Sequence, residues 1–379
     1  MQYSKPPKKL PLQIMSEPKI LVISNYSGLN SSRPEAEIMI GLAKRGIEIT
    51  IMTPPEAEYV ARFEEAGIRV IGFQPKKKFD RNEIGFIRKE LIAGEYNIIH
   101  LFNGKAIING MKAAKGLPVK VILYRGYCGN IHWWDPTAYL KFLNSRADGI
   151  WCIAPAVEKL INRNRIFGKK TAFTIAKGHH PDWYKDVKPK SLSEFNIPQG
   201  AFVATMVANA RPMKGLKYLI KATYKLSSNI PVYFLLIGNG LESAEIKKLV
   251  EKSPLKDRII FTGYRNDSLE LVKSSDVFVL SSLYGEAINK SVIEAMSVGV
   301  APIITDIPGN QGLVIDGESG LVIPRKDPKA IAKAIERLFR NPDEKKKLAF
   351  GAKNHIACNY HIDKSIDQLH RYYVELLGK

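Results

Sequence analysis

Two glutamates in the stretch SSLYGEAINKSVIEAM have residue types and a spacing that suit ligand binding. Glu286 follows the apolar run VFVLSS in a glycine-containing loop, and Glu294 lies on the predicted helix KSVIEAM, with seven residues between them. The N-terminus of such a helix offers free N–H groups and a positive dipole end to an anion. Two carboxylates beside an anion site need neutral hydrogen-bond donors as partners, and the hydroxyls of a sugar and of a ribose are such donors. The spacing therefore indicates a ligand in which a sugar and a ribose are joined by a diphosphate. The alternative is that Glu286 caps the helix and Glu294 is a solvated surface residue.

Two cations follow an earlier apolar run, in the stretch ANARPMKG. Arg211 and Lys214 could hold a diphosphate, Arg as a fork and Lys as a point charge, and Gly215 would allow the backbone to approach closely. A leaving diphosphate needs such cations because charge develops on it as the bond breaks. An ordinary basic turn is the alternative interpretation.

The elements that must position these residues alternate between short apolar strands and helices. In the first half KILVIS is a strand, Pro34–Gly46 has helical spacing with Pro34 in its first turn, and IEITIMT is the next strand. Further strands are IRVIGF, YNIIHLF, VKVILY and DGIWCI. This strand–helix–strand order predicts a parallel sheet with helices on both faces.

The pattern stops at Asp186–Gly200, a stretch rich in Pro, Ser and Lys whose first part we interpret as a linker, and then restarts. The later strands are AFVATMVAN, VYFLLIGNG, RIIFTGY, VFVLSS, VAPIITD and SGLVIPR, and helices are expected over 330–339 and 363–377. The fold class is therefore α/β, with two doubly wound parallel-sheet domains that face each other across a cleft. Ligands of such sheets bind outside the carboxyl ends of the strands.

Composition excludes several classes of protein. The chain has 379 residues, of which 45% are apolar and 25% charged, as in soluble globular proteins. Its three scattered cysteines give no zinc or disulfide framework and suit a reducing compartment. No run approaches the roughly 20 apolar residues of a membrane span. The start, MQYSKPPKKLPLQIMSEPK, lacks the apolar core of a secretory signal, and we expect a loose arm there.

The net charge of +20 is concentrated in the first half. Residues 1–190 carry 31 Lys and Arg against 17 Asp and Glu, whereas residues 191–379 carry 26 against 20. Such a field attracts polyanions, among them anionic lipid, nucleic acid and phosphorylated glycan. A solubilising surface is the alternative. The basic loop QPKKKFDR (Gln74–Arg81) could touch a membrane surface or be solvated.

Taken in order, the motifs RPMKG, LLIGNG, FTGY, SSLYGEAINKSVIEAM, SVGVAPIITD and DGESGLVIP resemble the family 4 glycosyltransferases of the GT-B fold. The resemblance is strong over residues 201–338 and present in outline before them. It implies an N-terminal acceptor domain of residues 1–185, joined by a C-terminal helix at about 362–379 that crosses back to it, and a donor domain of residues 186–361. It implies a retaining hexosyltransferase that uses a nucleotide-diphosphate sugar and no metal or other cofactor.

The resemblance also implies roles for individual residues. Glu286 would hold donor-sugar hydroxyls, Glu294 the ribose, and Arg211 with Lys214 the diphosphate. Backbone N–H groups of the next loop would reach the sugar and phosphates, and two glycine-containing strand ends would border the donor. These additional donor residues are Ala287, Ile288, Asn289, Lys290, Gly238, Gly263, Tyr264 and Arg265. In this family the acceptor attacks the front face of the sugar, and the departing phosphate helps to take its proton.

Three positions depart from the family pattern. The N-terminal loop NYSGLNSSR has only Gly28 where two glycines are usual, and Gly312 stands where a Glu is common. The family's His after VKVILY is replaced by Arg125, so donor-sugar positioning could fall to Arg125 or to His132. The loop YRGYCGNIHWWDP also contains Tyr127 and Trp133. With Gly28 these residues are acceptor-site candidates, because aromatic faces suit sugar rings, and a packed aromatic loop is the alternative.

Other functions remain open at this point. The leading function is transfer of a sugar to an envelope glycan or lipid-linked acceptor, such as lipopolysaccharide or another polysaccharide. We expect a cytoplasmic enzyme, with peripheral contact at the inner face of the anionic cytoplasmic membrane as an option and no nucleic-acid partner. A GT-B nucleotide-sugar epimerase, a sugar-nucleotide-binding pseudoenzyme and a nucleic-acid binder are the alternatives. The cluster His179, His180 and Asp182 suits an interdomain crossover better than a metal site.

Overall fold

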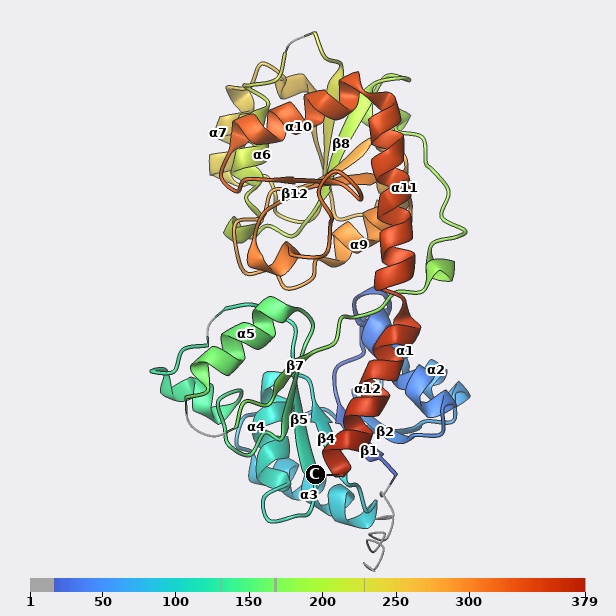
Figure 1. Cartoon of the computed structure of the whole chain (residues 1–379), viewed down its shortest axis with the longest axis vertical. Coiled ribbons are helices and arrows are strands. Elements are labelled where there is room, and N and C mark those ends of the chain that lie inside the picture. The colour runs from blue at the N-terminus through green and yellow to red at the C-terminus, as the bar shows by residue number, and fades with distance from the viewer. Residues whose placement is uncertain (1–16, 130, 167–168, 228, 379) are drawn as a thin grey trace, which may run out of the picture. The chain divides into compact units, whose positions relative to one another are not determined.

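The computed structural model describes residues 17–129, 131–166, 169–227 and 229–378. It contains two parallel sheets with helices on their faces (Figure 1), which confirms the predicted α/β class. By contacts the chain divides into two compact units. One contains the chain up to Leu123, Arg146–Gly149 and the residues from Ile366 onward; the other contains Tyr124–Ser145 and Ile150–Ser365. The domain boundary after residue 185 stays a prediction.

The first sheet has seven strands in the order β3-β2-β1-β4-β5-β6-β7. Strands β3 to β5 pair in parallel, as do β6 and β7. The strands are β1 (Lys19–Ile23), β2 (Glu48–Thr53), β3 (Arg69–Gly72), β4 (Ile98–Leu101), β5 (Lys120–Arg125), β6 (Gly149–Cys152) and β7 (Ala172–Thr174). The helices between them are α1 (Leu29–Lys44), α2 (Val60–Glu65), α3 (Arg81–Ala93), α4 (Gly104–Ala113) and α5 (Pro155–Asn164).

Helix α1 begins earlier than the sequence predicts. The N–H of Ser32 donates to the carbonyl of Gly28 at 3.0 Å, so the first turn forms over Leu29–Ser32. Pro34 therefore lies inside the helix, and its placement in the first turn was wrong. The missing N–H of Pro34 leaves one carbonyl of the preceding turn without its helical donor.

The second sheet has six strands in the order β10-β9-β8-β11-β12-β13, all paired in parallel. They are β8 (Phe202–Val207), β9 (Val232–Ile237), β10 (Ile259–Gly263), β11 (Val277–Leu280), β12 (Ala301–Thr305) and β13 (Leu321–Ile323). The helices are α6 (Leu216–Ala222), α7 (Ala244–Glu251), α8 (Ser268–Lys273), α9 (Lys290–Ser297), α10 (Pro328–Arg340) and α11 (Pro342–Asn359).

Both faces of the second sheet are buried, as the near-continuous apolar strands predict. In β8, Phe202, Ala204 and Met206 belong to a core shared with α6 and α10, while Val203 packs on the opposite face. Figure 1 shows α6, α7 and α10 grouped together and α11 next to α9. Because its two faces are filled, the sheet leaves its strand ends as the place where a ligand can approach.

Helix α12 (Ile362–Leu377) ends the chain, and from Ile366 onward it belongs to the first unit. A Cβ on Gly41 of α1 would lie 2.2 Å from Cδ1 of Ile366, so the two helices touch closely. The hydroxyl of Tyr373 lies 2.7 Å from Nδ1 of His100 on β4, and both residues are fully buried. Burial lowers the pKa of His100 to about 3, so this histidine is neutral at physiological pH. A buried polar contact thus fixes α12 to the first sheet.

The substitution Tyr373→Phe should destabilise the first unit, because it removes a buried hydrogen bond while keeping the ring. We expect a loss of about 1–2 kcal/mol in the free energy of unfolding, measured by urea denaturation. Tyr218→Phe is the control, since among the described residues the Tyr218 hydroxyl makes no hydrogen bond. Equal stability of Tyr373→Phe and the parent protein would show that this contact does not hold the helix.

Candidate functional site

Most of the residues predicted to bind the donor lie where the strand order of the second sheet reverses. Strand β8 has β9 on one side and β11 on the other, so the crossovers from β8 and β11 leave in opposite directions. The crevice outside the carboxyl ends at such a switch point is where doubly wound sheets bind ligands. The segments Ala208–Gly215 and Ser281–Asn289 both begin there.

Glycines let the loops at these strand ends come into contact. Gly215 has φ +67°, and a Cβ on it would lie 2.0 Å from the carbonyl oxygen of Ser281. Gly238, at the end of β9, has φ +142°, and its Cβ would lie 1.8 Å from the carbonyl oxygen of Ala208. A side chain at either position would force the backbones apart, so the narrow crevice depends on both glycines.

An ion pair joins the loop after β8 to the loop after β11. Nζ of Lys214 lies 2.6 Å from Oε1 of Glu286, and these side chains are only 15% and 11% exposed. The Ser282 hydroxyl donates to the same Glu286 oxygen at 3.0 Å, and the Ser281 hydroxyl donates to the carbonyl of Lys214 at 3.1 Å. The pair is therefore oriented by two serines and largely shielded from water.

Helix α9 begins beside this ion pair. Asn289 caps it, since its side-chain oxygen accepts from the N–H of Ser291 at 3.1 Å. The cap is therefore Asn289, and the alternative in which Glu286 caps the helix is wrong. The Ser291 hydroxyl donates to the carbonyl of Val207 at 3.1 Å, which fixes the start of α9 against the end of β8. Glu294, one turn along, pairs with Lys290 at 2.5 Å.

These groups line one cavity of about 310 Å³, the β8–β11 cavity. It brings together nine of the residues singled out from the sequence: Lys214, Gly238, Tyr264, Arg265, Glu286, Ile288, Asn289, Lys290 and Glu294. Glu294 is thus part of the cavity wall and not a freely solvated residue. Ala287 is buried next to Glu286, and the carbonyl of Gly263 accepts from the N–H of Gly238 at 2.9 Å.

Arg211 does not line the β8–β11 cavity. It lies in the wall of a neighbouring cavity of about 390 Å³, between the loop after β8 and helices α6 and α7. Lys214 and Asn209 line both cavities. Of the two cations predicted to act together, Lys214 is therefore the one placed against Glu286, while the exposed Arg211 lies beside it.

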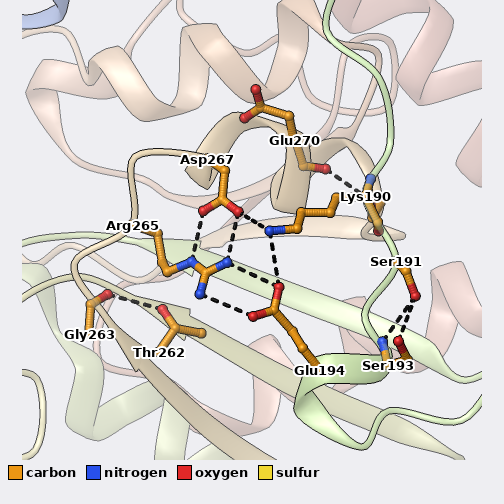
Figure 2. Close-up of polar contacts among 10 residues, drawn as sticks. Lys190, Ser191, Ser193, Glu194, Thr262, Gly263, Arg265, Asp267 and Glu270 are labelled. Carbon is orange, nitrogen blue, oxygen red and sulfur yellow. Dashed lines mark hydrogen bonds and ion pairs between the residues drawn. The ribbon is translucent and has the colours of Figure 1, made fainter.

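Arg265 is held between two carboxylates, as Figure 2 shows. It donates twice to Asp267, at 2.7 Å for both bonds, and twice to Glu194, at 3.1 and 3.0 Å. Lys190 pairs with the same two carboxylates. These bonds raise the pKa of Arg265 and hold the pKa of Asp267 well below its usual value. The guanidinium is thus bound to protein carboxylates, and it fixes the loop that carries the 67% exposed Tyr264.

Arg125 supports its own loop at the end of β5. Its Nε donates to the carbonyl of Tyr127 at 2.9 Å and its Nη2 to the carbonyl of Gly129 at 2.6 Å. The guanidinium also lies 4.8 Å from the centre of the Phe142 ring, and burial lowers its pKa. These contacts mean that Arg125 shapes the loop rather than standing free in it.

The other acceptor-site candidates lie at the surface of the first sheet's loops. His132 stacks on the ring of Trp134 with 4.9 Å between ring centres, and Trp133 is exposed. Gly28 is the N-cap residue of α1, at the end of β1. Exposed rings of this kind could meet a sugar, and equally a packed aromatic loop accounts for the His132–Trp134 stack.

The histidine cluster near the crossover makes packing contacts. His179 contacts the hydroxyl of Tyr184, and its N–H donates to the carbonyl of Tyr360 at 2.7 Å. His180 lies 3.6 Å from Asp182. Across the part of the chain that the structure describes, no three His, Cys, Asp or Glu side chains are grouped as metal ligands.

Sequence reasoning missed Ser282, Ser291 and Asn209, which orient or line the cavity. It also missed Glu194, which lies in Asp186–Gly200, the stretch whose first part we interpret as a linker. The serines carried a weak signal, since small hydroxyl residues directly precede Glu286 and begin the helix. Glu194 carried none, because its partner Arg265 is 71 residues away along the chain.

Comparison with known proteins gives a family match over part of the chain. Residues 187–355 match the model of the glycosyl transferases group 1. An uncharacterized glycosyltransferase of Methanocaldococcus jannaschii, MJ1069, is 24% identical over 79% of this chain and 74% of its own. The UDP-Gal:alpha-D-GlcNAc-diphosphoundecaprenol alpha-1,3-galactosyltransferase of Escherichia coli is 31% identical, over 51% of this chain and 49% of its own.

Solved structures agree in fold. A glycosyltransferase of Rickettsia africae has a TM-score of 0.79 with 18% identity, over 96% of this chain and 99% of its own. Anabaena HepE in complex with UDP-glucose has a TM-score of 0.71 with 18% identity, over 93% and 98%. None of the helices in the described ranges combines the length and apolar character of a membrane span. Residues 187–355 thus match the group 1 glycosyl transferases, and the chain has the GT-B fold of these solved structures.

Proposed function

We propose that the protein is a retaining, family 4 glycosyltransferase that moves a sugar from a nucleotide-diphosphate sugar to a glycan or lipid-linked acceptor. The observation that carries the proposal is the shielded Lys214–Glu286 pair beside the start of α9, in a cavity that also contains Glu294. A cation, a helix N-terminus and two carboxylates match a diphosphate flanked by two sets of hydroxyls.

The diphosphate is the leaving group, and its developing charge must be stabilised. Lys214 would meet it inside the cavity, the N–H groups at the start of α9 would meet it from the helix, and Arg211 would approach from the neighbouring cavity. We propose that these groups act without a metal ion. Lys214 would then exchange part of its contact with Glu286 for the phosphate oxygens.

The two carboxylates would recognise the hydroxyls on either side of the diphosphate. Ser282 and Lys214 hold Glu286 toward the cavity, which supports its role with the donor sugar. Lys290 holds Glu294 one turn into α9, which supports its role with the ribose. Tyr264, on the loop fixed by Arg265, would border the base.

In the proposed reaction the bond between the anomeric carbon and the phosphate oxygen breaks, and a bond from that carbon to the acceptor hydroxyl oxygen forms on the same face. The acceptor proton goes to the departing phosphate. No covalent sugar–enzyme intermediate is required. The protein binds and orients the donor and the acceptor, and it stabilises the charge that develops on the departing diphosphate.

The names of the relatives support the donor and acceptor classes. The Escherichia coli relative uses UDP-galactose and a diphosphoundecaprenol-linked sugar, by its name, and a Rhizobium meliloti relative acts in lipopolysaccharide core biosynthesis. We therefore propose a uridine diphosphate sugar as the first donor to test and an envelope glycan or glycolipid as acceptor, with the reaction on the cytoplasmic side. Arg125 would hold the loop that presents Tyr127, His132 and Trp133 to that acceptor.

The substitution Glu286→Gln should separate catalysis from nucleotide binding. Gln keeps the contact with Ser282 but removes the charge that neutralises Lys214, so UDP should bind as tightly as in the parent protein or more tightly. Sugar transfer and slow hydrolysis of the donor should fall by about 100-fold or more, since the hydroxyl contact acts in the transition state. Calorimetry measures the binding, and release of UDP from the sugar nucleotide measures turnover.

Glu318→Gln is the control, because Glu318 is an exposed glutamate of the same unit outside both cavities. Normal turnover of Glu286→Gln would contradict the proposed donor role. Loss of UDP binding in Glu286→Gln would instead show that this carboxylate helps to form the diphosphate site itself.

A second prediction concerns the loop fixed by Arg265. If Arg265 acts by positioning Tyr264, Glu194→Gln should weaken UDP binding about two- to fivefold, although Glu194 does not line the cavity. Its effect should not add to that of Arg265→Ala in a double-mutant cycle. Glu344→Gln, which breaks the exposed pair with Arg337, is the control. A large effect of Arg265→Ala with none from Glu194→Gln would mean that Arg265 contacts the nucleotide directly.

A further inference from the structure

A cationic surface lies in the first unit. Helices α3 and α4 and the loop before α3 form it, and we call it the α3–α4 face. Between Lys76 and Gly116 the sequence has nine Lys and Arg against four Asp and Glu. The cations that define the face are the exposed Lys76, Lys77, Lys78, Lys89, Lys105, Lys112 and Lys115.

Three of the four acidic residues of this stretch are engaged by other groups of the protein. Glu83 accepts from the backbone N–H of Lys76 and from the side chain of Asn109, each at 2.8 Å. Asp80 caps α3, and Glu90 pairs with Arg69 at 3.2 Å. None of the seven lysine ammonium groups of the face, within the part of the chain described, forms an ion pair with a carboxylate. Their positive charges can therefore attract an external anion.

Phe79 stands at the surface between these lysines in an unfavourable conformation. Its φ is +60°, in the left-handed region that bulky residues rarely adopt, and its side chain is 44% exposed. The buried Asn109 holds it there, accepting from the N–H of Phe79 and donating to the carbonyl of Lys77, both at 2.9 Å. Such strain persists only where surrounding contacts enforce it, and it points to a function for the exposed ring.

Further apolar side chains lie on the same helix. Phe86 and Ile92 of α3 are 37% and 56% exposed, and the ammonium of Lys112 on α4 lies 5.3 Å from the centre of the Phe79 ring. Aromatic and aliphatic groups among lysines match the interface of a bilayer, where rings enter the headgroup layer and ammonium groups stay in water.

We propose that the α3–α4 face docks on the surface of an anionic lipid bilayer. The lysines contact headgroup phosphates, and Phe79 enters the interfacial layer. Seven of the nine cations are lysines, which act as point charges without the planar fork of arginine that favours nucleic-acid bases. The exposed apolar groups would have no partner on a duplex, so lipid fits better than nucleic acid. This inference goes beyond the proposed function and does not depend on it.

The test is flotation of the full chain with vesicles of phosphatidylcholine alone or mixed with phosphatidylglycerol. We expect binding only to the mixed vesicles, and weaker binding as salt rises. Replacing Lys76, Lys77 and Lys78 together by Glu should lower the partition coefficient at least about tenfold. Phe79→Gly should also weaken binding, yet keep or raise the melting temperature, because glycine adopts this φ without strain.

The matched control reverses three exposed lysines of the second unit, Lys333, Lys346 and Lys347, and should bind as the parent protein does. UDP-induced thermal shifts, measured on every variant, report on the donor site separately and should not change. Equal binding to neutral and mixed vesicles, or an unchanged partition of the triple Lys76–Lys78 variant, would overturn the proposal. Binding to heparin or DNA without binding to the mixed vesicles would also overturn it, in favour of a soluble polyanion.

Discussion

The ion pair between Lys214 and Glu286 is the contact on which the site depends. It joins the loops after β8 and β11, at 2.6 Å, where the strand order of the second sheet reverses. Removing water from two charges is costly unless they meet each other and further hydrogen-bond donors. Ser282 supplies such a donor, and Gly215 lets the loop after β8 come close enough to the loop after β11 for the pair to form. The sheet therefore places a paired cation and carboxylate at its ligand-binding edge.

Such a pair is well suited to exchange partners. In the absence of ligand each charge satisfies the other, so the shielded crevice is stable. A diphosphate can compete for Lys214 because it carries more charge, and the start of α9 adds N–H groups on the same side. Glu286 can then accept hydroxyls in place of the ammonium. Lys214 and Glu286 would thus stabilise the crevice when no donor is bound and would recognise the donor when it binds.

Much of the fold and part of the site could be predicted from the sequence. The apolar runs gave both parallel sheets, because strands buried on two faces have few alternatives, and the loops after them contained Lys214, Glu286 and Glu294. The start of α1 differs from the prediction because proline favours the first turn of a helix, whereas here the helical bonds already begin at Gly28 and Pro34 lies inside the helix. The sequence could not predict the tertiary contacts. Glu194 pairs with Arg265, and Asn109 holds Phe79, across separations in sequence that no local pattern encodes. Likewise, Arg211 and Lys214 are three residues apart, yet only Lys214 lines the β8–β11 cavity, while both line the neighbouring one.

The most direct test of this account is a calorimetric titration with UDP and with uridine in the presence of EDTA, for the parent protein and for Lys214→Ala. We expect UDP to bind the parent protein at least about tenfold more tightly than uridine without any metal, as one charge-assisted contact to phosphate would give. The difference should largely disappear in Lys214→Ala, while uridine binding stays the same. Equal affinities for UDP and uridine, or UDP binding that appears only when a divalent metal is added, would contradict the assignment of Lys214 and the cavity to the donor diphosphate.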